Sequence, residues 1–133
     1  MRAFVRTLAV ASAVLATPLG AQSVQFPETE QGRLAAGFFQ AVNSPDEEAL
    51  MRYQEATFSE AALKRRSREQ RQALVRQLRD QAGALTLETI RAAGASQLVV
   101  TARGANLPPS QRLTITFSFT SGSPPKIDQV QIS

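Results

Sequence analysis

The sequence predicts an α+β domain in which about three N-terminal helices precede a four-stranded antiparallel sheet. Up to Gly83, apolar residues recur at helical spacing, and from Leu85 onward the apolar pattern is that of strands. The strands of the second half are separated by short turns, and consecutive strands on short turns pair antiparallel. Helices that precede such a sheet in the chain pack on one of its faces, which is the α+β arrangement.

The first 21 residues are predicted to be a cleavable signal peptide. Arg2 and Arg6 precede an uncharged apolar run at residues 8–15, and Pro18 and Gly20 interrupt it before the expected cleavage site. The apolar run is far shorter than the ~20 residues that a membrane span needs. No cysteine follows it that a lipid could modify. We therefore expect a periplasmic or extracellular bacterial protein without a membrane anchor, with residues 22–133 forming one domain.

Charge and composition argue against several classes of protein. The 133 residues include 15 basic and 11 acidic ones, a net charge of +4. Loss of residues 1–21 would remove two arginines and no acid, which leaves a net charge of +2. So small a net positive charge gives little support for nucleic acid binding. The chain has no cysteine, so its stability must come from packing and not from disulfides.

Three helices are predicted between Thr29 and Gly83. Thr29 can cap the first, which ends near Asn43. Residues 44–47, Ser-Pro-Asp-Glu, predict a capping box for the second, with serine as the cap and proline at the first helical position. Residues 67–70, Ser-Arg-Glu-Gln, predict a second capping box, and Gly83 closes the helix that follows. Residues 58–63 are predicted to add a short extra turn between the second and third helices. The apolar face of the first helix comprises Leu34, Ala35, Phe38, Phe39 and Val42, that of the second Ala49, Leu50 and Tyr53, and that of the third Leu74, Val75, Leu78 and Ala82.

Four strands are predicted after the helices, at residues 85–90, 98–103, 113–120 and 126–132. The third alternates strictly between apolar residues and hydroxyl-bearing residues, as a strand with one buried face does. In the fourth, Ile127 is out of phase with the later apolar residues. We therefore predict a bulge near Asp128 or Gln129.

Several segments together resemble the cone-shaped fold of the nuclear transport factor 2-like superfamily, in which helices cover a curved antiparallel sheet. More narrowly, the chain is similar to an exported bacterial module that often precedes a β-lactamase-like serine hydrolase domain or a C-terminal-processing-type peptidase domain. The resemblance covers residues 28–133 and implies the curvature of the sheet. It rests on Gly32-Arg33-Leu34-Ala35-Ala36 through Phe39, Asn43-Ser44-x-Asp46 through Ala49-Leu50, Phe58-Ser59 with Ala62-Leu63, the arginine-rich helix to Leu78, and Pro124-Pro125-Lys126-Ile127.

The residue types that are missing argue against most catalysis. Without histidine and cysteine the chain cannot form a Ser-His-Asp or Cys-His nucleophile system, and it lacks the usual ligands of zinc, copper and non-haem iron. We expect no cofactor. The acids fall mostly at helix starts, where they cap helices or offset the helix dipole. Asp128 lies in a predicted strand, where we favour a position facing solvent.

Aromatic side chains are the candidates for a ligand pocket. In a cone fold the residues that form the core also wall the cavity, so both roles stay open for them. Tyr53 is the best polar candidate, because its hydroxyl needs a partner if it is buried. The favoured alternative for Tyr53 is a core residue with its tip at the surface. The pocket candidates are Phe39, Tyr53, Phe58, Phe117 and Phe119.

A cluster of basic residues is the candidate surface for a partner. Five cations fall within residues 64–71, and further arginines continue along the same helix. The favoured alternative is a solvated helix face, since Glu69 and Asp80 dilute the charge and no aromatic residues are interleaved for base stacking. This surface could bind an acidic partner, an anionic lipid surface or nucleic acid, and its candidate residues are Arg65, Arg68, Arg76 and Arg79.

Three functional hypotheses follow. The first is a non-enzymatic exported domain that binds a small apolar ligand or a protein. The second, from the resemblance, is an accessory domain of a separately encoded serine hydrolase or peptidase. The third is a cofactor-free isomerase or dehydratase with a carboxylate inside the cone. A homodimer through the open face of the sheet is a further expectation that the resemblance carries.

Overall fold

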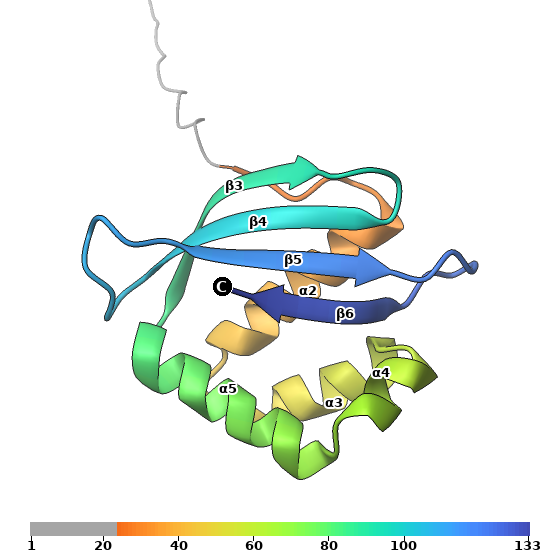
Figure 1. Cartoon of the computed structure of the whole chain (residues 1–133), viewed down its shortest axis with the longest axis horizontal. Helices are drawn as coiled ribbons and strands as arrows, with labels where there is room; N and C mark the ends of the chain where they lie inside the picture. Colours follow the sequence, from red (N-terminus) through yellow and green to blue (C-terminus); the bar gives the residue numbers. More distant parts are fainter. Residues whose placement is uncertain (1–23) are drawn as a thin grey trace, which may run out of the picture.

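The computed structural model describes residues 24–133 as four helices followed by one four-stranded antiparallel sheet (Figure 1). The predicted α+β class and the order of helices before strands are confirmed. The helix number differs from the prediction, because residues 60–65 form a helix where the sequence indicated only a turn. The predicted signal peptide, residues 1–21, lies outside the described residues.

The helices are α2 (Glu30–Asn43), α3 (Glu47–Thr57), α4 (Glu60–Arg65) and α5 (Arg68–Ala82). The predicted cap of the first is confirmed, since Thr29 Oγ1 accepts a hydrogen bond of 3.0 Å from the Gly32 amide. The predicted capping box of α5 is also confirmed, with Ser67 and Gln70 bonding each other's backbone amides. Gly83 ends α5 with a positive φ of 72°, a conformation that glycine adopts without steric cost.

The predicted start of the second helix is wrong. α3 begins at Glu47 and is capped by Asp46, whose carboxylate accepts a hydrogen bond of 3.0 Å from the Glu48 amide. Ser44 is not the N-cap of α3 but the C-cap of α2, and its amide donates to the Ala41 carbonyl at 3.2 Å. Its hydroxyl accepts from the Asp46 amide, and its carbonyl accepts a bond of 2.6 Å from Arg79. The carbonyl of Asp46 accepts the first helical bond of α3, which the Ala49 amide donates at 3.1 Å.

The strands are β3 (Leu85–Ala92), β4 (Gln97–Gly104), β5 (Leu113–Phe119) and β6 (Ile127–Ile132), and they pair in chain order. The predicted bulge is confirmed at Asp128. Ser118 pairs with Gln129 and Phe119 with Ile127, which leaves Asp128 without a partner across the ladder. β3 has a second irregularity, between Leu87 and Thr89, that the sequence did not indicate.

One face of the sheet forms the core with the helices. α2 lies behind the sheet in Figure 1, and α3, α4 and α5 continue beyond β6. Val100, Ile115 and Phe117 of the inner face are fully buried. Leu50 and Met51 of α3 complete the same cluster from the helical side. Within residues 24–133, no helix is long and apolar enough to cross a membrane.

Candidate functional site

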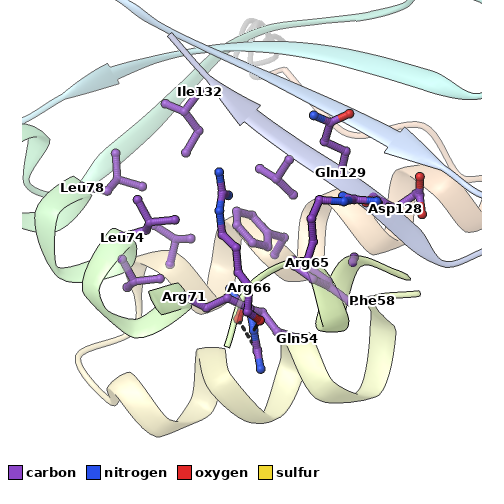
Figure 2. A pocket seen from close by; sticks show the side chains of 15 residues that line it. Gln54, Phe58, Arg65, Arg66, Arg71, Leu74, Leu78, Asp128, Gln129 and Ile132 are labelled. Atoms are coloured by element: carbon purple, nitrogen blue, oxygen red, sulfur yellow. Dashed lines mark hydrogen bonds and ion pairs between the residues drawn. The ribbon is translucent and has the colours of Figure 1, made fainter. Parts of the chain in front are cut away.

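A pocket lies between the helices and the edge strand β6, with a cavity volume of about 110 Å³ (Figure 2). We call it the helix–β6 pocket. Larger hollows exist, but their walls include the N-terminal segment 24–28 or the loop at 105–111, whereas helices and β6 wall this one. Its lining residues are Phe38, Val42, Gln54, Phe58, Ala62, Arg65, Arg66, Arg71, Leu74, Val75, Leu78, Asp128, Gln129, Val130 and Ile132.

Most of the pocket wall is apolar, and two of its side chains are unusually exposed. Leu74 of α5 is 45% exposed and Ile132 of β6 is 39% exposed, although both line the pocket. Val75 and Leu78 on α5 continue this wall, since residues three and four apart share a helix face. Ile132 pairs with the buried Ile115, which places its side chain on the inner face of the sheet.

The segment between α3 and α4 closes one end of the pocket. Phe58 forms an isolated parallel bridge with Ile127, and the Ser59 amide donates to the Ile127 carbonyl at 2.9 Å. Ser59 also caps α4, because its hydroxyl accepts from the Ala62 amide at 3.1 Å. These contacts fix Phe58 against β6, where its ring stacks on Phe38 with centroids 6.2 Å apart.

The bulge in β6 brings Asp128 to the rim of the pocket. Its side chain is 40% exposed, so it is partly buried where the sequence favoured a position facing solvent. The Ser59 hydroxyl donates to Asp128 Oδ1 at 2.7 Å, and Arg65 Nη2 lies 3.9 Å from the same oxygen. Arg65 also donates to the Asp128 carbonyl at 3.0 Å. The Asp128 carboxylate is therefore held by two side chains of this chain.

A buried polar pair, Gln54 and Arg71, lies at the base of the pocket (Figure 2). Arg71 is only 9% exposed; it donates to Gln54 Oε1 at 3.0 Å and to the Arg66 carbonyl at 3.3 Å. Both acceptors are neutral, and no carboxylate of residues 24–133 pairs with Arg71. Sequence reasoning missed this pair. The available signal was the position of Arg71, four residues before Val75 on the buried side of α5.

Arg66 extends from the end of α4 into the pocket, toward Ile132 (Figure 2). Its backbone carbonyl accepts the bond from Arg71. Its guanidinium has no hydrogen bond or ion pair with any side chain in the described part of the chain. The pocket therefore combines an apolar wall with a cationic group that is free to bind an anion.

The predicted pocket residues do not share one cavity. Phe58 lines the helix–β6 pocket, Phe39 lines a hollow beside residues 24–28, and Phe119 lines a third hollow. Phe117 is fully buried. Three of these phenylalanines nevertheless belong to one row of ring contacts: Phe58 stacks on Phe38, Phe38 meets Phe117 edge-on, and Phe117 stacks on Phe119.

Tyr53 lies outside the pocket and stabilises the packing of α3 against α2. Its hydroxyl donates to the Leu34 carbonyl at 2.6 Å, and its ring fits against Gly37. Burial raises the pKa of the Tyr53 hydroxyl above its usual value, because the ionised form loses solvation. The structure thus places Tyr53 in the packing role that was the alternative to a pocket residue.

The predicted partner-binding arginines all make contacts within the chain. Arg68 pairs with Glu48 and Glu55, and Arg76 forms two hydrogen bonds of 2.9 Å with Glu47. The bonds from Arg76, followed by that from Gln72, lower the pKa of the Glu47 carboxyl. Arg79 donates to the carbonyls at the C-terminal end of α2, and Arg65 holds Asp128. Docking of an acidic partner on these arginines stays a prediction.

The described residues offer no metal site, since no three acidic side chains among them gather in a group that could hold an ion. No protein-family model matches the chain, and no curated protein has a significantly similar sequence. The function is therefore inferred from the chemistry of the pocket: an apolar wall, a buried cation and one unpaired guanidinium.

Proposed function

We propose that this chain is an exported, non-enzymatic domain that binds a small apolar molecule in the helix–β6 pocket. We also propose that the domain is of the nuclear transport factor 2-like type, with a sheet that curves into a cone. The order of helices before a β3-β4-β5-β6 antiparallel sheet supports that assignment. The tripartite pattern of residues 1–21 supports export.

The exposure of Leu74 and Ile132 is the observation that carries the binding proposal. In the described residues only one other large hydrophobic side chain, Val24, is comparably exposed. Leu74 and Ile132 come from different elements and line the same pocket. Apolar surface in water costs about 25 cal/mol per Å², so a ligand that covers both side chains gains binding free energy.

The size of the pocket indicates the size of the ligand. Its volume is about 110 Å³, and an apolar cavity of about 150 Å³ holds a benzene molecule. The pocket is open to solvent at Leu74 and Ile132, so part of a ligand can project from it. A single ring or a short alkyl chain fits this description.

A catalytic role for the same pocket has less support. Asp128 is the single carboxylate among the residues that line it, and Ser59 and Arg65 already bind that group. A general base for an isomerase or dehydratase needs a carboxylate that reaches the substrate proton. Asp128→Asn is therefore expected to leave ligand binding intact.

The binding proposal can be tested by titration calorimetry with toluene, an uncharged ligand with a single ring. We expect the wild-type protein to bind toluene and Leu74→Glu to weaken binding at least tenfold, because a carboxylate replaces part of the apolar wall. Gln77→Glu adds the same charge to an exposed position of α5 outside the pocket, and it should bind like wild type. Equal binding by both variants, or no binding by wild type, would refute the proposal.

A further inference from the structure

We propose that the ligand of the helix–β6 pocket is a small amphiphile with one carboxylate, which the Arg66 guanidinium binds while the apolar wall holds the rest. This inference rests on the proposed function and adds the chemical class of the ligand. A medium-chain fatty acid such as octanoate represents that class.

The charge of the pocket is the first reason. Arg65, Arg66 and Arg71 line it together with a single carboxylate, Asp128, so its lining has a net charge of +2. Residues 24–133 as a whole also have a net charge of +2. The lining of this one small pocket therefore has the same net charge as the entire domain. The apolar wall lowers the local dielectric constant and so strengthens the attraction for an anion.

The pairing of the cations is the second reason. Arg65 is bound to Asp128, but Arg71 is nine-tenths buried and has only the neutral acceptors Gln54 Oε1 and the Arg66 carbonyl. A buried charge is costly unless a counter-charge accompanies it. Arg66, whose guanidinium has no partner in the described residues, is the second cation of this pocket without a carboxylate.

Two arginines of α5 outside the pocket have carboxylate partners, whereas the third, Arg79, binds backbone carbonyls. Arg68 has two glutamates as partners, and Arg76 has Glu47. The arginines that link α5 to α3 therefore form ion pairs with glutamates, whereas Arg66 forms no ion pair with a carboxylate of the described residues. Within the described residues, Arg66 and Arg71 differ from these arginines in lacking a carboxylate partner.

The direction of Arg66 is the third reason. Its side chain runs from the end of α4 toward Ile132, on the same side of the pocket as Leu74 (Figure 2). A guanidinium can donate two parallel N–H bonds to a carboxylate. A ligand held in this way has its apolar part beside the two side chains whose exposure carries the proposed function.

The test compares three ligands of equal chain length by titration calorimetry: octanoate, octan-1-ol and octylammonium. We expect octanoate to bind about tenfold more tightly than octanol and octylammonium to bind least, since a guanidinium binds a carboxylate more strongly than a hydroxyl and repels an ammonium. Arg66→Gln should lower octanoate affinity about tenfold and leave octanol affinity unchanged. Arg66→Lys, which keeps the charge but loses the paired donors, should fall between.

Arg91→Gln is the matched control. Arg91 is an exposed arginine of β3 that does not line the pocket, so its loss changes the net charge equally without touching the site. Octanoate affinity should match that of wild type in this variant. Higher salt should weaken octanoate binding to wild type more than octanol binding, because it screens the ion pair.

The experiments distinguish failure of the carboxylate inference from failure of the proposed function. Equal affinities for octanoate and octanol, unchanged by Arg66→Gln, would overturn the carboxylate inference and leave the proposed function standing. Binding of none of the three ligands, together with no binding of toluene, would overturn both proposals. Co-sedimentation with phosphatidylglycerol vesicles in the absence of octanoate binding would also overturn the inference, since it would assign the cations to a membrane surface.

Discussion

The side chain of Asn43 and the backbone of Leu85 form two reciprocal hydrogen bonds. Asn43 Nδ2 donates to the Leu85 carbonyl, and the Leu85 amide donates to Asn43 Oδ1, each at 2.8 Å. Asn43 is the last residue of α2 and Leu85 is the first residue of β3, 42 positions later. This one side chain therefore joins the end of the first described helix to the start of the sheet.

Asn43→Ala should destabilise the fold by about 2–3 kcal/mol, because it leaves both backbone groups of Leu85 without their partners. The free energy of unfolding in urea measures the change. Gln40→Ala, at an exposed position of the same helix, is the control and should change stability by less than about 0.5 kcal/mol. Equal stability of the two variants would show that the paired bonds contribute nothing.

Gly37→Ala should destabilise the protein, although alanine usually improves a helix by about 1 kcal/mol. A Cβ at position 37 would lie 2.5 Å from Tyr53 Oη and 2.8 Å from its ring. Displacement of that ring breaks its bond to the Leu34 carbonyl. We expect a loss of about 1–2 kcal/mol in the free energy of unfolding.

The clash can be separated from other effects with a double-mutant cycle. In a Tyr53→Leu background the ring is gone, so Gly37→Ala should become neutral or stabilising. Additive effects of the two substitutions would contradict the proposed contact.

Tyr53 should titrate above the usual tyrosine pKa in the folded protein. Burial raises the pKa of its hydroxyl, and the chain has no other tyrosine and no tryptophan, so absorbance at high pH reports this group alone. Since the folded pKa is raised, the stabilisation is fully present below the unfolded pKa of about 10 and is lost as pH rises through the folded value.

The measurement is the tyrosinate absorbance of native and urea-unfolded protein as a function of pH. Tyr53→Phe should remove the titration and weaken the fall in stability above pH ~10. Coinciding titration curves for the native and unfolded protein would contradict the burial of this hydroxyl.

Arg79→Ala should cost more stability than Arg76→Ala, although both residues lie on α5 three positions apart. Arg79 donates to the carbonyls of Ala41, Val42 and Ser44 at the end of α2, and of these only the Ala41 carbonyl also accepts a bond from a backbone amide, that of Ser44. Arg76 forms an exposed ion pair with Glu47. We expect the free energy of unfolding to fall by about 1.5–3 kcal/mol in Arg79→Ala and by less than about 1 kcal/mol in Arg76→Ala.

Thermal or urea unfolding of the two variants measures this difference. Arg76→Ala should also raise the pKa of the Glu47 carboxyl toward its usual value, which carboxyl NMR signals follow directly. A greater loss of stability for Arg76→Ala than for Arg79→Ala would reverse the roles assigned to the two arginines.

Much of the fold was predictable because its signals are local. The cap at Thr29 and the capping box at residues 67–70 each need only atoms within three residues. The bulge at Asp128 was visible because a change of phase in an alternating pattern moves a side chain to the other face. The start of α3 was predicted wrongly because Asp46 and not Ser44 is the cap, and serine and aspartate are about equally good helix caps.

The candidate site was much less predictable. Of the five aromatic residues proposed for a pocket, Phe58 alone lines the helix–β6 pocket. The arginines of α5 read as a surface cluster, because the glutamates that pair with them lie on α3 and the pairing needs both helices in place. Arg66 is exposed and sits in the same basic run, so nothing local distinguishes it from its neighbours.

By itself, the sequence determined the α+β class, the order of the elements, most helix ends and the bulge, since periodicity and capping act over a few residues. The tertiary structure alone decided what meets at the pocket. Ser59 and Asp128 are 69 positions apart, and Arg71 and Gln54 are 17 apart. The contacts that turn an apolar wall and two uncompensated arginines into one site arise only when the helices pack beside β6, because burial and charge pairing depend on distance in space.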